Sequence, residues 1–196
     1  MRSIAIVTIL LFGGITAVMA QATPSESYSG DAALTYHWIR TNDPPGGDCG
    51  CFNLNGGGLS GSWILLPRLS LVGEVSVEHA GSVLSTGKSL TLTSYLAGGR
   101  YRLPQPWLHG LHAPQPFAQA LVGGGHAGGG IAGAGDGSST FVTRIGGGID
   151  LPVRSGVSIR IIQADYYLTD FANSVNNHQN NLLLTAGVVL HWSRIK

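Results

Sequence analysis

The feature that most constrains this chain is a two-residue alternation of side-chain polarity, seen most clearly in LSLVGEVSVE at residues 69–78. The odd positions hold Leu, Leu, Gly, Val and Val, whereas the even positions hold Ser, Val, Glu, Ser and Glu. Successive side chains of a β-strand point to opposite faces, so this segment has one apolar face and one mostly polar face. It therefore predicts a strand that separates two different environments.

Alternation of this kind recurs along the chain, and patterns of helical period are scarce, which predicts an all-β protein. We expect eight strands, at residues 32–41, 57–66, 69–79, 89–102, 116–126, 139–151, 156–168 and 180–192. The first, third, fifth and seventh connections are long or rich in turn residues, whereas the second and sixth are short. This pattern is typical of an eight-stranded antiparallel up-and-down transmembrane β-barrel, which is the fold we expect. The fourth connection, residues 103–115, is longer than the pattern predicts.

The first 20 residues have the pattern of a secretory signal peptide, with Arg2, an apolar stretch and the ending Val18-Met19-Ala20. We predict cleavage after Ala20, the alternative being an uncleaved N-terminal anchor. No later segment approaches about 18 consecutive apolar residues, so membrane contact would come through strands. We expect a signal peptide at 1–20, a short lead at 21–30, the barrel at 31–192 and a tail at 193–196.

The charge of the chain is low and balanced. The formal net charge is +1 and charged residues make up 11% of the sequence. No basic run interleaved with aromatic residues is present, so we expect no nucleic-acid partner. We also expect no cofactor.

The last predicted strand ends in TAGVVLHW, residues 185–192. This stretch resembles the C-terminal assembly signal of bacterial outer-membrane barrels, with matching residues at Thr185, Gly187, Leu190 and Trp192. In that family the aromatic residue is usually the last of the chain, whereas here four residues follow it. The resemblance implies recognition by the barrel-assembly machinery.

A wider resemblance covers about residues 27–192. GGGIDLPV at 146–153 and VSIRIIQADYYLT at 157–169, followed by the last strand, resemble the sixth to eighth strands of small OmpA-like outer-membrane barrels. The chain has no room for the peptidoglycan-binding domain that some members carry, so we expect a barrel alone.

The resemblance implies export to the bacterial outer membrane and contact with its lipid and lipopolysaccharide. It also implies a structural or surface-interaction role without catalysis. That role would use the external loops at residues 42–56, 80–88, 127–138 and 169–179, whose partner the sequence does not identify.

The interior of an eight-stranded barrel is just wide enough to be filled by side chains. Alternation places five charged residues there: Glu74, Glu78, Arg144, Asp150 and Arg160. Strict alternation would point the next polar residues, Gln163 and Asp165, into lipid. We predict a β-bulge near Ile161-Ile162 that returns both to the interior and adds Asp165 to the polar network. The bulge would be unnecessary if Asp165 lay at the outer rim.

Aromatic residues sort into two groups under this topology. One group falls near the periplasmic rim and the other near the outer rim, as expected for the girdles of a membrane barrel. The first comprises Trp63, Tyr101, Phe117 and Trp192, and the second Trp38, Phe141, Tyr166 and Tyr167.

Candidate reactive residues are few. Cys49 and Cys51 in the first long connection predict a loop disulfide in an exported protein, with free thiols or an intermolecular bridge as alternatives. His109 and His112 are spaced for a metal only on a helix, and their segment is flanked by prolines, so we expect no metal site.

Two other functions of an exported β-barrel would require different residues. A lipid A-modifying outer-membrane enzyme, an acyl hydrolase or transferase, would need a serine, a histidine and a carboxylate together. His37, His79 and Glu78 are candidates, but nothing marks one serine as activated. A soluble lipocalin-like binding barrel would need an apolar interior and a polar exterior, the reverse of the pattern at 69–78.

Overall fold

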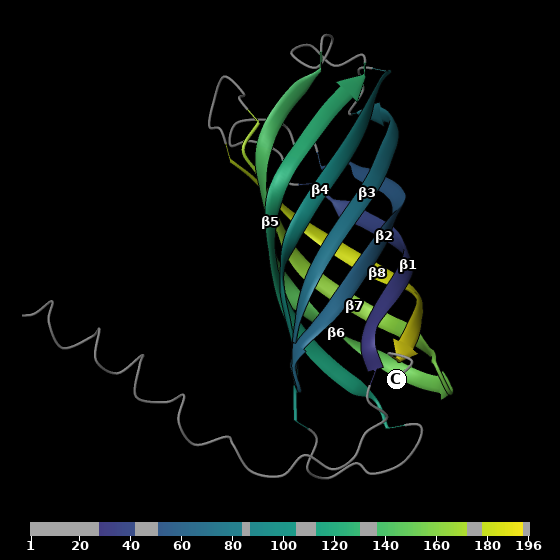
Figure 1. Cartoon of the computed structure of the whole chain (residues 1–196). Coiled ribbons are helices and arrows are strands. Elements are labelled where there is room, and N and C mark those ends of the chain that lie inside the picture. The colour runs from purple at the N-terminus through teal and green to yellow at the C-terminus, as the bar shows by residue number, and fades with distance from the viewer. Residues whose placement is uncertain are drawn as a thin grey trace, which may run out of the picture.

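The computed structural model describes residues 28–41, 51–83, 87–104, 113–129, 137–171 and 178–193. They form a closed barrel of antiparallel strands in which each strand pairs with its neighbours in sequence and β8 pairs with β1 (Figure 1). The predicted eight-stranded antiparallel barrel is therefore confirmed. The strands are β1 (Tyr28–Arg40), β2 (Asn53–Leu66), β3 (Leu69–Val83), β4 (Lys88–Arg102), β5 (Gln115–Gly129), β6 (Ser138–Arg154), β7 (Val157–Thr169) and β8 (Gln179–Ser193).

The described residues contain no helix that is long and apolar enough to cross a membrane.

The upper rim in Figure 1 carries the β1–β2, β3–β4, β5–β6 and β7–β8 connections, and the lower rim carries the others. Several strands extend further toward the upper rim than the sequence predicted. Residues 53–56, 80–83 and 127–129, expected in loops, belong to β2, β3 and β5. In these segments the apolar residues, among them Leu54, Ala80 and Val83, face the lumen and no longer the exterior. Backbone pairing continues through this reversal, since it does not depend on the side chains.

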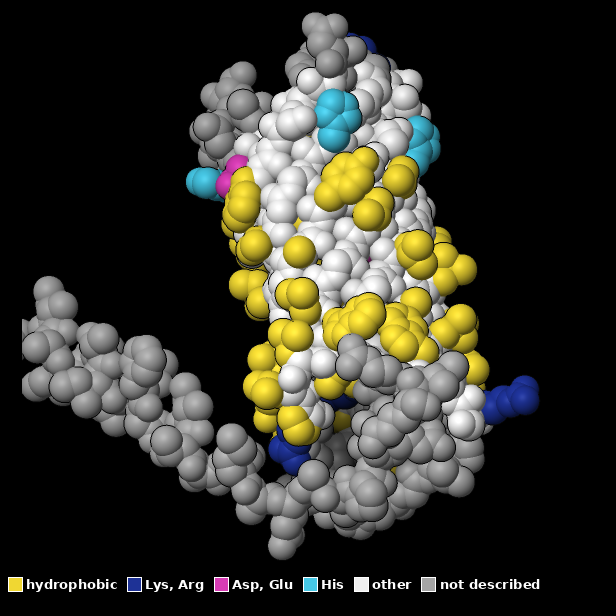
Figure 2. Space-filling view, in the orientation of Figure 1, with side chains coloured by type: hydrophobic (Ala, Val, Ile, Leu, Met, Phe, Trp, Pro, Cys, Tyr) yellow, Lys and Arg dark blue, Asp and Glu magenta, His cyan; other side chains and the backbone are white. Residues whose placement is uncertain are grey.

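The barrel has an apolar exterior and a charged interior. Leu71, Val75 and Val188 point outward and are 53%, 47% and 45% exposed, while Glu74 and Arg144 point inward and are 6% and 1% exposed. Apolar side chains are spread over the middle and lower part of the face shown in Figure 2. This arrangement is the reverse of that in a water-soluble barrel.

The upper part of the lumen is filled by apolar side chains. Ile39, Leu54, Val83 and Leu92 are buried there and belong to one packed cluster, against which Phe52 and Phe171 also lie. The buried ion pairs lie below this layer, toward the middle and lower rim. In the described lumen the ion pairs therefore lie toward one end, and the other end is filled by apolar side chains.

The predicted bulge is present in β7. The pairing of β7 shifts register against β6 and against β8 between Arg160 and Gln163. Ile161 and Ile162 consequently both point outward, at 52% and 47% exposure, while Gln163 and Asp165 are buried. The extra residue keeps an amide and a carboxylate out of the apolar exterior.

The aromatic residues follow the expected girdles with two exceptions. Trp63, Tyr101 and Trp192 are exposed near the lower rim, and Phe141 and Tyr166 near the upper. Trp38 is partly exposed. The placement of Phe117 and Tyr167 in the girdles was wrong, because both are buried in the lumen. Phe117 shares the inward face of β5 with Gln119 and Leu121, and the bulge turns Tyr167 inward with Asp165.

We expect deletion of Ile161 to prevent folding. Without the extra residue Gln163 and Asp165 would face outward, and Arg144 would lose its Asp165 partner, a loss of about 3–5 kcal/mol for a broken buried ion pair. Folding into phosphatidylcholine vesicles, followed by the mobility difference between heated and unheated samples in gel electrophoresis, measures the folded fraction. Ile161→Val, which keeps the residue count, should fold as the unaltered protein does. An equal folded fraction for the deletion would contradict this role of the bulge.

Candidate functional site

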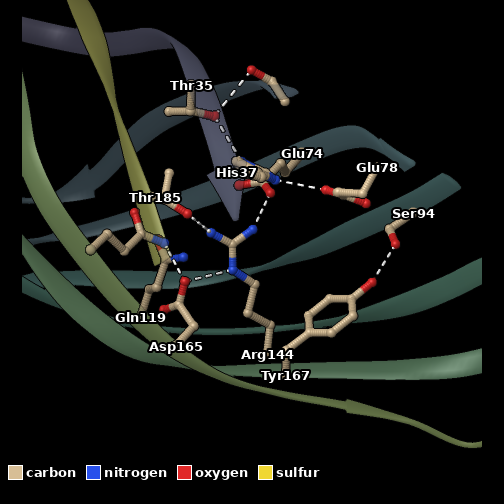
Figure 3. A network of polar contacts seen from close by, with 12 residues as sticks. Thr35, His37, Glu74, Glu78, Ser94, Gln119, Arg144, Asp165, Tyr167 and Thr185 are labelled. Atoms are coloured by element: carbon tan, nitrogen blue, oxygen red, sulfur yellow. Dashed lines mark hydrogen bonds and ion pairs between the residues drawn. The ribbon is translucent and has the colours of Figure 1, made fainter. Parts of the chain in front are cut away.

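The centre of the lumen is organised by Arg144, which β6 directs inward. Its Nε donates to Asp165 Oδ2 of β7 at 2.7 Å, its Nη1 donates to Glu74 Oε1 of β3, and its Nη2 lies 3.4 Å from Thr185 Oγ1 of β8 (Figure 3). All four side chains are buried. One guanidinium therefore joins three strands other than its own across the barrel.

A second ion pair lies on β6 and β7. Arg160 binds Asp150 through two bonds, Nε to Oδ1 at 2.8 Å and Nη2 to Oδ2 at 3.1 Å. Its Nη1 donates to Gln163 Oε1 at 2.9 Å, and Gln163 Nε2 donates to Asp165 Oδ2 at 2.6 Å. The amide of Gln163 thus connects this pair to the Arg144 cluster.

A third cluster, nearer the lower rim, contains residues that the sequence reading missed. Asp31 Oδ1 accepts from Arg100 at 3.2 Å and Asp31 Oδ2 from Arg102 at 2.8 Å. The guanidinium carbons of Arg100 and Arg160 lie 4.9 and 4.6 Å from the centroid of the Phe117 ring. A buried aromatic ring between two desolvated cations offsets part of their repulsion through its negative face.

The period-two alternation of side-chain faces also predicts that Arg100 and Asp31 point into the lumen. Arg100 shares the inward face of β4 with Ser94 and Leu96. Asp31 lies one residue before the predicted start of the first strand, so the predicted alternation assigned it to neither face.

Taken together, these three clusters are electrically balanced. The carboxylates of Asp31, Glu74, Asp150 and Asp165 are matched by the guanidinium groups of Arg100, Arg102, Arg144 and Arg160. Opposed charges in a desolvated lumen stabilise each other only when each has its partner. The arrangement is that of a structural filling, with every charge directed at another side chain of the wall.

Glu78 belongs to a separate buried contact, in which its partner is His37. His37 Nδ1 lies 2.7 Å from Glu78 Oε1, and His37 Nε2 lies 2.9 Å from Thr35 Oγ1 (Figure 3). The Thr35 hydroxyl donates its only proton to the carbonyl of Gly58 at 3.1 Å, so Nε2 must donate to Thr35. The contact between Nδ1 and Glu78 Oε1 is then a second hydrogen bond of the same ring.

This Thr–His–Glu sequence of bonds resembles the order of groups in a hydrolase triad. It lacks the properties of one, because the Thr35 proton is given to Gly58 and not to the histidine. His37 and Glu78 are 0% and 1% exposed. His79, the other histidine considered from the sequence, points outward and bonds Thr91 instead.

The residues that resemble the assembly signal divide between the two faces of β8. Thr185 is buried in the lumen, while Leu190 and Trp192 are exposed on the outer wall. Trp192 packs edge-on against Trp63 with centroids 6.3 Å apart. Gly187 lies against β1, where an added Cβ would collide with the carbonyl of Leu34 and the Cα of Thr35. Glycine at this position therefore permits the close approach of the strands that close the barrel.

Other candidate residues lie outside the described part of the chain. Cys49 and the His109–His112 pair are among them, as are the signal peptide and residues 194–196. The disulfide between Cys49 and Cys51 remains a prediction. Within the described ranges, no group of three or more His, Cys, Asp or Glu side chains is arranged to hold a metal ion.

We expect Arg144→Met to lower the free energy of unfolding by about 3–5 kcal/mol, because Glu74 and Asp165 would remain buried without their cation. The triple variant Arg144→Met, Glu74→Gln, Asp165→Asn should regain most of that loss, since it removes the unpaired charges. Urea unfolding in vesicles, followed by tryptophan fluorescence, measures both. Arg154→Met, at an exposed position of the lower rim, is the matched control and should change stability by less than about 0.5 kcal/mol. No recovery in the triple variant would contradict the electrostatic explanation.

No protein-family model matches the chain, and no curated protein matches it in sequence. Its structure is similar to that of Neisserial surface protein A, with a TM-score of 0.60 and 16% identity over 85% of this chain and 100% of that one. It is less similar to Ail, the attachment invasion locus protein of Yersinia pestis, with a TM-score of 0.49 and 15% identity over 83% of this chain and 99% of that one. For OprG of Pseudomonas aeruginosa the TM-score is 0.47 and the identity 10%, over 86% of this chain and 98% of that one. The similarity concerns the fold alone: this chain has the fold of the small eight-stranded outer-membrane barrels.

Proposed function

We propose that this chain is an integral protein of the bacterial outer membrane with a structural or surface-interaction role and no catalytic activity. The observation that carries the proposal is the closed wall with an apolar exterior and paired charges inside. Such a wall is stable in a bilayer, because its backbone is bonded throughout and its charged groups avoid hydrocarbon.

The role is assigned to the upper rim. The connections there are the longest of the chain apart from the β4–β5 connection, and loops tolerate the sequence variation that binding requires. Neisserial surface protein A, which has the same fold, is a surface protein by name. The external loop partner, the use of the barrel-assembly machinery and cleavage of residues 1–20 are parts of this proposal.

The lumen argues against a wide diffusion channel. Apolar residues of the upper cluster, among them Leu54 and Leu92, are 2% and 6% exposed. An eight-stranded interior filled by side chains in this way is too narrow for such a channel.

No observation favours the lipid A-modifying enzyme. The arrangement nearest to a triad is buried and its hydroxyl donates to a backbone carbonyl. The soluble lipocalin-like alternative is disfavoured by the apolar exterior.

Expression in a Gram-negative host tests the proposal. We expect the chain in the outer-membrane fraction, extracted only by detergent, with protease on intact cells cutting at the upper-rim connections and not at Ser155 between β6 and β7. Mass analysis of lipid A from the same cells should show no lost or transferred acyl group, whether or not His37 is replaced by Gln. Recovery in the soluble periplasmic fraction would overturn the membrane assignment, and altered lipid A that depends on His37 would overturn the absence of catalysis.

A further inference from the structure

Two buried hydrogen-bond donors in the lower part of the lumen lack an acceptor. The guanidinium group of Arg100 donates from Nε to Gln119 Oε1 at 3.2 Å and from Nη1 to Asp31 Oδ1 at 3.2 Å. Its Nη2 has no hydrogen-bond partner among the described residues, and neither has Nε2 of Gln119. Arg100 and Gln119 are 1% and 4% exposed, and Gln119 also points into the lumen (Figure 3). The two donors without a partner therefore belong to side chains that are bonded to each other.

Arg160 shows what the same edge of a guanidinium group binds when it is complete. Its Nε and Nη2 donate to the two carboxylate oxygens of Asp150, at 2.8 and 3.1 Å. In Arg100 this edge meets one amide oxygen, that of Gln119, and meets it at Nε only. Because Nε can only donate, the orientation of the Gln119 amide is fixed, with its NH₂ group as a further donor. The group missing from this edge is therefore an acceptor.

The lower part of the lumen also has an excess of positive charge. Its ion pairs join three guanidinium groups to two carboxylates, those of Arg100, Arg102 and Arg160 to those of Asp31 and Asp150. The carboxylate that balances the third guanidinium belongs to the central cluster, where Arg144 faces two carboxylates. Arg100 and Arg160 approach the same Phe117 ring, at 4.9 and 4.6 Å from its centroid. A negative charge beside Arg100 would offset this local excess.

These properties favour a small anion over a water molecule. A water molecule that accepts from both donors must place its own two hydrogens on acceptors. Both oxygens of Asp31 and the amide oxygen of Gln119 already accept from arginines. Asp165 Oδ1, an acceptor without a partner, lies two strands from Gln119 across Gly146 and would take only one of them. A chloride ion needs no acceptors and supplies the negative charge.

The size of the lumen and its access set the kind of anion. The interior of an eight-stranded barrel is just wide enough for side chains, so a monatomic ion fits beside them better than phosphate or a carboxylic acid. Arg102, whose side chain is 22% exposed, lies at the lower rim and binds the same Asp31 as Arg100 does. An anion that enters from the lower rim meets this guanidinium first and is attracted by it.

We propose that the lumen binds one chloride ion through Arg100 Nη2 and Gln119 Nε2, and that this ion stabilises the closed barrel. The ion supplies the second acceptor at the half-bonded edge of Arg100 and the negative charge that the lower clusters lack. Hydrogen bonds to a full charge are stronger than those between neutral groups. The inference goes beyond the role proposed for the loops and depends on no loop partner.

The first test measures how the stability of the full-length chain depends on chloride. The chain is folded in phosphatidylcholine vesicles and unfolded with urea over a tenfold range of chloride concentration, with gluconate keeping the ionic strength constant. A ligand that binds only the folded state lowers the unfolding equilibrium constant, and we expect a decrease of about fivefold to tenfold over this range. Tryptophan fluorescence measures the unfolded fraction. An equilibrium constant that does not change with chloride would overturn the inference.

Gln119→Glu supplies the missing acceptor and the negative charge from the chain itself. Its unfolding should not depend on chloride, and at the lowest chloride concentration it should be more stable than the unaltered protein. Without an anion site, a further buried carboxylate would destabilise the barrel. Gln115→Glu, the same change at the exposed lower end of β5, is the matched control and should keep the chloride dependence. A Gln119→Glu variant that stays chloride-dependent, or that does not fold, would contradict the proposal.

Crystals of the unaltered protein grown in sodium bromide locate the ion directly, because bromide replaces chloride and scatters anomalously. We expect an anomalous peak within hydrogen-bond distance of both Arg100 Nη2 and Gln119 Nε2. A water molecule at this position without anomalous signal, or bromide on the protein surface only, would overturn the inference and leave the membrane assignment intact. Failure of the proposed function is seen separately, as recovery of the chain in the soluble periplasmic fraction.

Discussion

The closed, alternating wall is the constraint on which the rest of this structure depends. Because β8 pairs with β1, the sheet has no open edge. Each strand side chain therefore points either to the exterior of the barrel or into the lumen. With an apolar exterior, a charged side chain at mid-height must point inward, where it needs a partner. Arg144 meets this condition by binding Glu74 and Asp165 at once, which fastens β3, β6 and β7 together across the lumen.

The bulge in β7 shows how local irregularity serves this constraint. One residue more than regular pairing allows lets two isoleucines face outward in succession and turns Gln163 and Asp165 inward. Several interior contacts depend on this register. Gln163 bridges Arg160 and Asp165, and the Tyr167 hydroxyl lies 2.6 Å from Ser94 Oγ. A departure from ideal strand geometry thus connects the Arg160–Asp150 pair to the Arg144 cluster.

Much of this was predictable from polarity alone, because period-two alternation decides which face a residue occupies. Glu74, Arg144 and the bulge were found in that way. Phe117 and Tyr167 were misplaced because aromatic character was weighed above face, although the predicted bulge itself turns Tyr167 inward. The pairing of Asp31 with Arg100 could not be predicted, since it joins β1 to β4 across the lumen and depends on the stagger of the closed sheet.

The histidines show how position in the wall decides what one residue type does. His37 faces inward, where Glu78 and Thr35 occupy both of its ring nitrogens and no external group reaches it. His79 and His126 face outward, each bonded through Nδ1 to a hydroxyl of the neighbouring strand. A wall filled with paired charges provides a rigid support, and the chemistry that remains available to partners lies on its outer surface and upper rim.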